Sequence, residues 1–346
     1  MVGKKALVIF FVALMAFVSV QMAVTGQEAI AQSSCAADQE KLYVVALTSV
    51  VASIARQLGG DYVEVHSIVP AGFCPGHYDI TPGDVAAVAE ADVIIGHKWP
   101  WFEKLAQAVY EATGKNVSAI FREVSGPWNT PDGAIAHVKA VASALCEFEE
   151  NATRRDHYKA MNETICSELL AVTGELKARA EELDVGSVKV ICMQWQAGFV
   201  KWLGFDVVAT FGPPERLSPE DVASLVETGR SEGVALVIDN LQSGTELGAS
   251  IAREIGAEHV VLTNFPDAVP GTPTLADMMR YNAAQLFNAT QAWRSKGEEI
   301  RRLEMEIEGL RGQNTLLIGL TASFAIVAVA EAVVLISMRR GGRKAL

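Results

Sequence analysis

Side chains that could bind a ligand or perform chemistry follow short apolar runs at several points of this chain. The segment PAGFCPGHYDITP follows Val69 and carries Cys74, His77 and Tyr78, and His97 follows the next apolar run. Cysteine and histidine ligate borderline metal ions, and in enzymes they also serve as nucleophiles and bases. These residue types therefore indicate either a metal site or a catalytic site at the ends of the apolar runs.

A second group of candidates is dominated by amide and aromatic side chains. Its members are Trp128, Asn129, Gln194, Trp195, Glu215, Asp239, Asn240 and Asn264, and Cys192 and Asp267 lie beside them as further possible metal ligands. Neutral amides compensate poorly for the hydration that a bare divalent cation loses on binding. This group therefore suits a larger polar solute or a metal chelate better than a bare ion.

The apolar runs alternate with helical segments along the whole body of the chain. The expected strands are 43–47, 63–69, 92–96 and 117–121 in the first half, and 188–193, 206–210, 235–239 and 259–263 in the second half. Apolar runs that are separated by helices are typical of parallel sheets covered on both faces. The sequence predicts an α/β fold with two lobes, each containing a parallel sheet flanked by helices. Ligands of such sheets bind outside the carboxyl ends of the strands, so both groups of candidates are expected at one cleft between the lobes.

A long helix is expected to join the two lobes. The lobes are assigned to residues 40–150 and 185–293, and the connecting helix to 151–184, which is rich in helix-forming residues. Gly174 is the one strong helix breaker in this segment, so two helices broken at Gly174 are the alternative.

A charged stalk follows the second lobe at 294–313. Ile300, Leu303, Ile307 and Leu310 recur there at three- and four-residue spacing. This spacing predicts an amphipathic helix, and a weak coiled coil would show the same pattern.

Both ends of the chain indicate export and membrane attachment. Residues 315–338 are apolar and long enough to cross about 30 Å of hydrocarbon as a helix. Four cationic residues in the tail 339–346 favour a cytoplasmic tail, which places the lobes outside the cell. Residues 1–31 have the features of a signal peptide, although a permanent N-terminal anchor would look similar. We therefore expect a cell-membrane protein with a single C-terminal span and an extracellular binding domain. Glu331 is the one acid of the span, and it either contacts a partner helix or lies close enough to the interface to be tolerated.

The overall charge and the spacing of the cysteines argue against a nucleic-acid partner and a structural zinc site. The formal net charge of −12 gives no basic surface for phosphates, so a nucleic-acid partner is not expected. The five cysteines include no CxxC motif, which argues against a structural zinc site. Disulfides between Cys146 and Cys166, or between Cys74 and Cys192, stay open.

The chain resembles a known family over about residues 41–293. The loop GFCPGHYDITPGD, the segment ADVIIGHKWPWFEKL and the order of elements are similar to the zinc- and manganese-type solute-binding proteins of metal ABC transporters. The resemblance implies that fold and a permease as partner. It also implies a divalent metal of the zinc or manganese class, carried as the bound solute and not as a catalytic cofactor.

The residues at the family's metal-binding positions differ in this chain. When the loops are aligned on Tyr78, the family's first histidine falls on Gly76, its second-lobe ligand on Gln194 and its late acid on Asn264. Its second histidine has no evident match in GPWNTPDG. A site rebuilt from nitrogen, sulfur and oxygen ligands would use the following residues: Cys74, His77, His97, Cys192 and Asp267. His137, His157 and His259 are expected to lie away from this site.

The function predicted from these features is capture of a divalent metal ion outside the cell for delivery to an ABC permease. The first alternative is the same role for a non-metal solute or a metal chelate. The second alternative is an extracellular metal-assisted enzyme. The sequence contains no phosphate loop, HExxH motif or GxSxG motif, so we expect no enzymatic activity.

Overall fold

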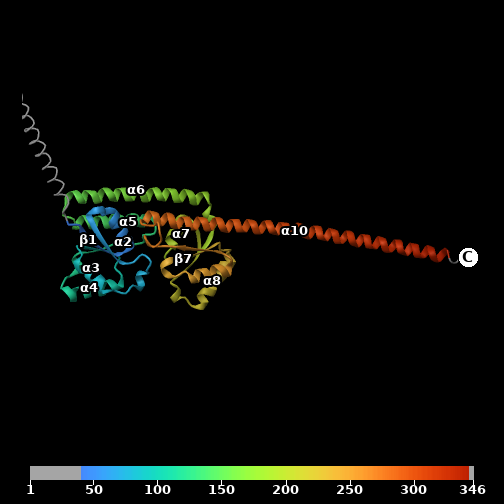
Figure 1. Cartoon of the computed structure of the whole chain (residues 1–346), viewed down its shortest axis with the longest axis horizontal. Coiled ribbons are helices and arrows are strands. Elements are labelled where there is room, and N and C mark those ends of the chain that lie inside the picture. Colours follow the sequence, from blue (N-terminus) through green and yellow to red (C-terminus); the bar gives the residue numbers. More distant parts are fainter. Residues whose placement is uncertain (1–39, 343–346) are drawn as a thin grey trace, which may run out of the picture. The chain divides into compact units, whose positions relative to one another are not determined.

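The structure is a computed structural model that describes residues 40–342, with side chains through residue 335 (Figure 1). The expected signal peptide at 1–31 and residues 343–346 of the expected tail lie outside the described residues. The chain divides into two compact units. The first contains the described residues up to Gly126 together with Ile135–Cys166, and the second contains Pro127–Ala134 and the residues from Ser167 onward.

The first unit is built on a four-stranded parallel sheet with the strand order β2-β1-β3-β4. Its strands are β1 (Leu42–Thr48), β2 (Val63–Val69), β3 (Val93–Gly96) and β4 (Phe121–Glu123). Its helices are α2 (Ser49–Gly59), α3 (Pro82–Glu90), α4 (Pro100–Thr113) and most of α5 (Pro131–Phe148). Consecutive residues of β1 and β3 are fully buried, as expected for central parallel strands that are covered on both faces.

The fourth strand of this sheet lies later in the chain than predicted. The prediction placed it at 117–121, but Val117–Ala119 form a 3₁₀ turn and β4 begins at Phe121. The side chain of Asn116 accepts a hydrogen bond from the backbone N–H of Ser118 at 3.0 Å. This local bond stabilises a turn where the apolar pattern alone indicated a strand.

The second unit repeats the arrangement with the strand order β6-β5-β7-β8, again all parallel. Its strands are β5 (Lys189–Met193), β6 (Asp206–Phe211), β7 (Leu236–Asn240) and β8 (Glu258–Leu262). Its helices include α7 (Ala197–Leu203), α8 (Pro219–Glu232) and α9 (Glu246–Ile255). The predicted α/β fold with two parallel sheets flanked by helices is confirmed.

Helix α6 (Ala152–Glu182) is continuous, so the prediction of a single long connecting helix is confirmed. A Cβ added at Gly174 would meet no heavy atom within 4 Å, so this glycine lies in open space. The helix therefore continues through Gly174 at the small energetic cost of one exposed helical glycine.

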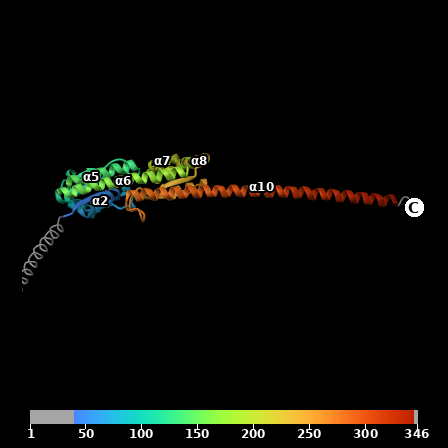
Figure 2. The same ribbon diagram turned by 90° about the horizontal axis from the view of Figure 1, so that it is seen from above.

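Helix α10 (Leu275–Gly342) joins the expected stalk and the expected membrane span into one helix of 68 residues (Figure 2). The two were predicted as separate segments, but no proline interrupts residues 276–342, so nothing ends the helix between them. Its first turns pack on β8, whereas every residue from Glu298 to Leu335 is exposed. The most apolar 18-residue stretch has a mean hydropathy of 2.2, which is apolar enough for a membrane span.

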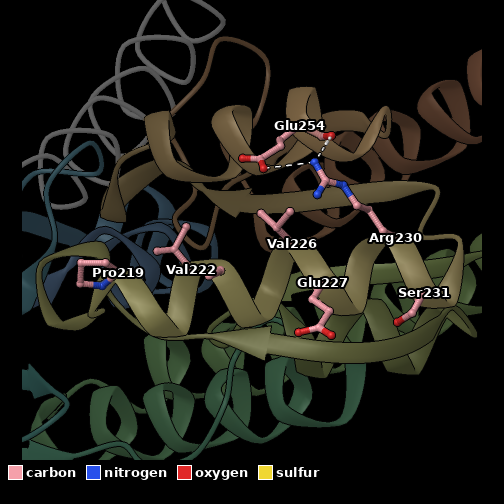
Figure 3. Close-up of a pocket in the computed structure, with 8 residues that line it drawn as sticks. Pro219, Val222, Val226, Glu227, Arg230, Ser231 and Glu254 are labelled. Carbon is pink, nitrogen blue, oxygen red and sulfur yellow. Dashed lines mark hydrogen bonds and ion pairs between the residues drawn. The ribbon is translucent and has the colours of Figure 1, made fainter.

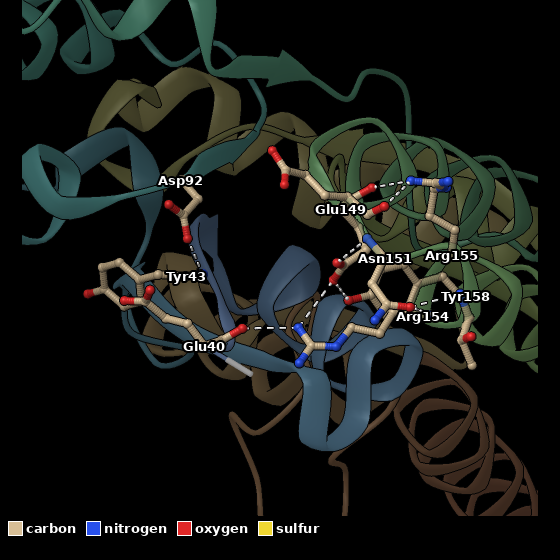
Figure 4. Close-up of polar contacts among 10 residues, drawn as sticks. Glu40, Tyr43, Asp92, Glu149, Asn151, Arg154, Arg155 and Tyr158 are labelled. Carbon is tan, nitrogen blue, oxygen red and sulfur yellow. Dashed lines mark hydrogen bonds and ion pairs between the residues drawn. The ribbon is translucent and has the colours of Figure 1, made fainter. Parts of the chain in front are cut away.

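A buried polar cluster fixes the junction between α5 and α6 in the first unit (Figure 4). Tyr158 donates its hydroxyl to Glu149 at 3.0 Å, and Arg154 lies 3.6 Å from the same carboxylate. Arg154 also donates to the backbone oxygen of Glu40 at 3.0 Å, just before β1. Burial and the neighbouring Glu149 raise the pKa of Tyr158, so its hydroxyl remains a donor. The cluster therefore ties the beginning of the sheet to the helical layer.

Candidate functional site

The loop after β2 is held by contacts from two neighbouring helices. Trp101 of α4 donates its indole N–H to the carbonyl of Pro75 at 2.8 Å, and the Tyr78 hydroxyl donates to Asp84 at 3.0 Å. Burial, followed by the hydrogen bond to Asp84, raises the pKa of Tyr78 to about 12. The loop presents Cys74 half-buried and His77 exposed. Tyr78 thus stiffens the loop that carries two of the predicted metal ligands.

Two imidazoles meet in the first unit. His97 directly follows β3 and His137 lies in α5, and their Nε2 atoms are 3.1 Å apart. The Nε2 atom of His97 is also 3.4 Å from the carbonyl oxygen of Gly126, which follows the neighbouring strand β4. His137, which was expected to lie away from the site, therefore contacts one of the candidate ligands.

Burial sets the protonation of His97 in this pair. Only 1% of the surface of His137 is exposed. Burial, with a smaller contribution from His137, lowers the pKa of His97 to about 4. His97 is therefore neutral near pH 7, and neutral imidazole is the form that ligates metal ions.

The spacing of the two nitrogens fits a common metal ion. Zinc binds imidazole nitrogen at about 2.0–2.1 Å, and an ion about 2.05 Å from both atoms would make an N–metal–N angle of about 98°, twice the arcsine of 1.55/2.05. Among the described residues, no three His, Cys, Asp or Glu side chains gather closely enough to hold a metal ion. The pair could therefore supply two ligands and leave further positions open.

The second unit gathers amide groups at the carboxyl ends of its strands. We call Asn129, Asn264 and the backbone carbonyl of Trp195 the amide cluster. Asn129 donates to the Trp195 carbonyl at 2.8 Å and to the Asn264 side chain at 3.3 Å. The Trp128 indole N–H donates to the backbone oxygen of Asn264 at 2.5 Å. Four predicted ligand-binding residues are thereby brought together in one unit.

A second set of amides lies at the ends of β5 and β7. Gln196 donates to Asn240 at 3.0 Å, and Asn240 donates onward to the Ser243 hydroxyl at 2.9 Å. The side-chain oxygen of Gln196 is buried and has no hydrogen-bond partner within the described residues. A buried acceptor of this kind could receive a hydrogen bond from a bound solute. Gln196 follows the end of β5, where the sequence pattern places groups that line a binding site.

Asp239, a predicted ligand-binding residue, is engaged within the second unit. Its Oδ2 atom lies 2.8 Å from Nε2 of His259 on β8, and none of its surface is exposed. Gly248 of α9 packs directly against the same carboxylate. Burial raises the pKa of Asp239, and the hydrogen bond with His259 opposes that shift without cancelling it. The Asp239–His259 pair connects β7, β8 and α9.

The remaining predicted residues lie in three different environments. Cys192 is fully buried in β5, and its burial strongly raises the pKa of the thiol, so the thiolate that a metal requires is disfavoured. Asp267 is exposed in a turn with a φ of 64°, and Glu215 is exposed in a 3₁₀ turn (Pro214–Arg216). Gln194 and Trp195 are exposed after β5.

The disulfides that the sequence left open are not formed. Cys74, Cys146, Cys166 and Cys192 are all free thiols. In the second unit, a groove between α8 and α9 contains none of the predicted residues (Figure 3). Its lining includes Val222, Val226 and the ion pair between Arg230 and Glu254, which lie 3.2 Å apart. It lies on helices and not at strand ends, so we assign it no role in binding.

Comparisons with known proteins agree with this fold. Residues 44–289 match the family model described as "Zinc-uptake complex component A periplasmic". The "Metal ABC transporter substrate-binding lipoprotein SsaB" of Streptococcus sanguinis is 26% identical over 233 residues, which are 59% of this chain and 73% of the relative. The "Iron ABC transporter substrate-binding lipoprotein MtsA" of Streptococcus pyogenes is 23% identical over 253 residues, 65% of this chain and 78% of the relative.

Solved structures share the same architecture. "Crystal structure of ZnuA" aligns with a TM-score of 0.58 at 21% identity, covering 72% of this chain and all of that one. The Mn-bound periplasmic metal binding protein from Candidatus Liberibacter asiaticus aligns with a TM-score of 0.60 at 16% identity and the same coverage. The chain therefore belongs to the family of zinc- and manganese-type solute-binding proteins of metal ABC transporters.

Proposed function

We propose that this chain captures a transition-metal ion outside the cell and delivers it to an ABC permease. Family membership supports a substrate-binding role, and the named relatives serve metal ABC transporters, including one for iron. The observation that carries the metal part of the proposal is the contact between His97 and His137, whose Nε2 atoms lie 3.1 Å apart.

Imidazole does not bind all transition-metal ions equally well. Neutral imidazole suits zinc, copper, iron and nickel, whereas manganese is bound more often by carboxylates and other oxygen ligands. Within the described residues, no carboxylate joins the two histidines in a group of three possible ligands. Zinc is therefore the first choice of cargo, with His77 and Cys74 on the loop after β2 as candidates for the further ligands.

The C-terminal helix supplies the attachment that this role requires. Residues 298–335 expose every side chain, and the apolar part is long enough to cross a bilayer. A single span would keep the binding units outside the cell and at a high local concentration near the permease.

A second candidate function is capture of a metal chelate or another polar solute. Two amides favour it, because Gln194 and Asn264, the latter in the amide cluster, occupy the positions that the family resemblance assigns to charged or histidine ligands. The buried oxygen of Gln196, which lacks a partner within the described residues, adds an acceptor that a neutral solute could use.

Calorimetric titration of the metal-depleted full chain in detergent tests the choice between these cargoes. We expect zinc to bind more tightly than manganese. We also expect His97→Ala or His137→Ala to weaken zinc binding by more than about tenfold, because even the outer-shell partners of a metal ligand contribute about 10–100-fold. His66→Ala, on β2, is the matched control and should retain full affinity.

Three outcomes would count against the proposal. Full zinc affinity in both variants would remove the histidine pair from the site. An absence of metal binding, together with a melting shift caused by a chelated metal, would favour the second candidate. Failure of the metal-loaded chain to pass its ion to any ABC permease in a reconstituted membrane would refute the importer role.

A further inference from the structure

The exposed part of α10 carries an apolar seam that nothing in the described chain covers. We call Ile300, Leu303, Ile307 and Leu310 the stalk seam. These side chains are 46–58% exposed, although they are apolar residues in a highly charged segment. Their spacing of three and four residues places them at the a and d positions of consecutive heptads. An exposed apolar row of this kind marks a surface that binds a partner.

We propose that a second copy of this chain covers the stalk seam in a parallel two-stranded coiled coil. Ile300 and Ile307 occupy the a positions, and Leu303 and Leu310 occupy the d positions. β-Branched residues at a combined with leucine at d favour two parallel strands. The next a position is Asn314, and a single asparagine at a specifies both register and a dimeric state.

In this register, one pair of charged residues beside the stalk seam is attractive between the two copies. A second pair consists of like charges, and their repulsion is reduced. Glu306 at a g position would face Arg311 at an e position of the second copy, which is an attractive pair. Glu299 and Glu304 would meet as like charges. Glu299, however, is already paired with Arg302 of its own helix at 2.7 Å, which reduces that repulsion.

The short length of the stalk explains why the dimer would depend on the membrane. Two apolar heptads are fewer than the three or four that sustain a coiled coil in water. A membrane span fixes both helices in parallel orientation and raises their effective concentration. The inference rests on the span of the proposed function, but it does not depend on the cargo.

The same register continues into the span and gives its one acid a partner. Leu317 is the next d residue, and Glu331 falls at a d position two heptads further on. Polar side chains of packed spans hydrogen-bond with one another, so Glu331 of each copy would face its counterpart and not lipid.

Disulfide cross-linking of the full chain in lipid vesicles tests the seam. Leu303→Cys places a thiol at a d position, and Met305→Cys, two residues along the same exposed segment, places one at the outward f position. At low protein density we expect mild oxidation to cross-link Leu303→Cys several-fold more than Met305→Cys. The unsubstituted chain reports the background from the native cysteines. Equal cross-linking of the two variants, or none above background, would overturn the proposal.

A charge placed in the seam provides a second measurement. In lipid nanodiscs that hold the span, Ile307→Glu should convert the dimer into a monomer by mass measurement, while zinc affinity stays unchanged because the seam lies outside the α/β units. Asn314→Ile should keep the chains associated but relax the restriction to dimers. A monomeric unsubstituted chain that still binds zinc would refute the dimer and leave the proposed function intact.

Discussion

Burial shifts the pKa of individual side chains in this protein and so changes the chemistry that they can perform. His97 and His137 are separated by 40 positions in sequence, yet their Nε2 atoms are in contact, and burial keeps the His97 imidazole neutral near pH 7. A neutral imidazole such as that of His97 is suited to a metal ion and poorly suited to binding an anion. Cys192 shows the opposite case, because burial removes its thiol from metal and redox chemistry.

We expect the cysteines to differ strongly in reactivity. Cys192 should resist a maleimide reagent in the native protein, because burial raises the pKa of its thiol, whereas the half-buried Cys74 should react. Mass spectrometry of labelled peptides at neutral pH measures both rates, and denaturation should make the two thiols equally reactive. Labelling of native Cys192 at the rate of Cys74 would show that β5 is not packed as described.

The stability contribution of Asp239 should fall as pH rises. Burial raises its native pKa above the ordinary value of 3.8, so the folded chain holds this proton to higher pH than the unfolded chain. The free energy of unfolding therefore loses a contribution as pH increases from about 3.8 through the native pKa. Asp239→Asn should remove this loss. Relative to the natural chain, the free energy of unfolding of the variant should therefore increase as pH rises over this range. Urea unfolding at a series of pH values measures this difference.

Asp221 provides a control of opposite sign. Its pKa is lowered by hydrogen bonds from the backbone and hydroxyl of Ser218, which cap α8. Its contribution is therefore present above the unfolded pKa and is lost as pH falls through the native pKa. Relative to the natural chain, Asp221→Asn should therefore lose stability as pH rises. A relative gain of stability with rising pH in Asp221→Asn, or no pH-dependent difference for Asp239→Asn, would contradict these assignments.

At the scale of elements, small residues determine how closely helices approach the sheets. Gly248 allows α9 to pack on Asp239 at the end of β7, whereas Gly174 in α6 lies in open space. The same residue type therefore has a packing role in one helix and none in the other.

These two glycines should respond to alanine in opposite directions. A Cβ at Gly248 would lie 2.1 Å from Oδ2 of Asp239, so Gly248→Ala should destabilise the fold by about 1–3 kcal/mol, as overpacking does. Gly174→Ala should stabilise it by about 0.5–1 kcal/mol, because alanine is the better helix former and meets no neighbour. Chemical denaturation of both variants compares the two values, and a stabilising Gly248→Ala would contradict the described packing of α9.

At the scale of the whole molecule, the two α/β units and the exposed part of α10 are energetically separate. Lys296 forms an ion pair with Glu258 of β8 at 2.7 Å, and the residues from Glu298 to Leu335 are all exposed. The α/β units therefore owe little of their stability to the later part of α10.

Truncation after Gly297 should release a soluble chain with a nearly unchanged melting temperature and unchanged zinc affinity. Differential scanning fluorimetry and calorimetric titration, compared with the full chain in detergent, measure both properties. A fall of many degrees in the melting temperature would show that residues beyond Gly297 stabilise the α/β units. Truncation after Thr274, which removes the buried Met278 and Asn282, is the contrasting variant and should unfold the second unit.

The sequence by itself determined the elements of this protein, because strands, helices and the apolar span depend on local periodicity. Seven of the eight strands lie within about one residue of the expected ends, and β4 is displaced because Asn116 caps a turn that the apolar pattern does not reveal. The continuity of α10 was missed because a change from charged to apolar composition does not end a helix.

The candidate site was decided by tertiary structure. Strand-end residues such as His97 could be selected from sequence because parallel strands present their carboxyl ends at one edge. Their partners could not be selected: His137 lies on the buried face of a helix, and His259 reaches Asp239 from a neighbouring strand. Such pairs depend on contacts between residues that are distant in the chain, and on the burial that those contacts produce, which no local pattern of residues encodes.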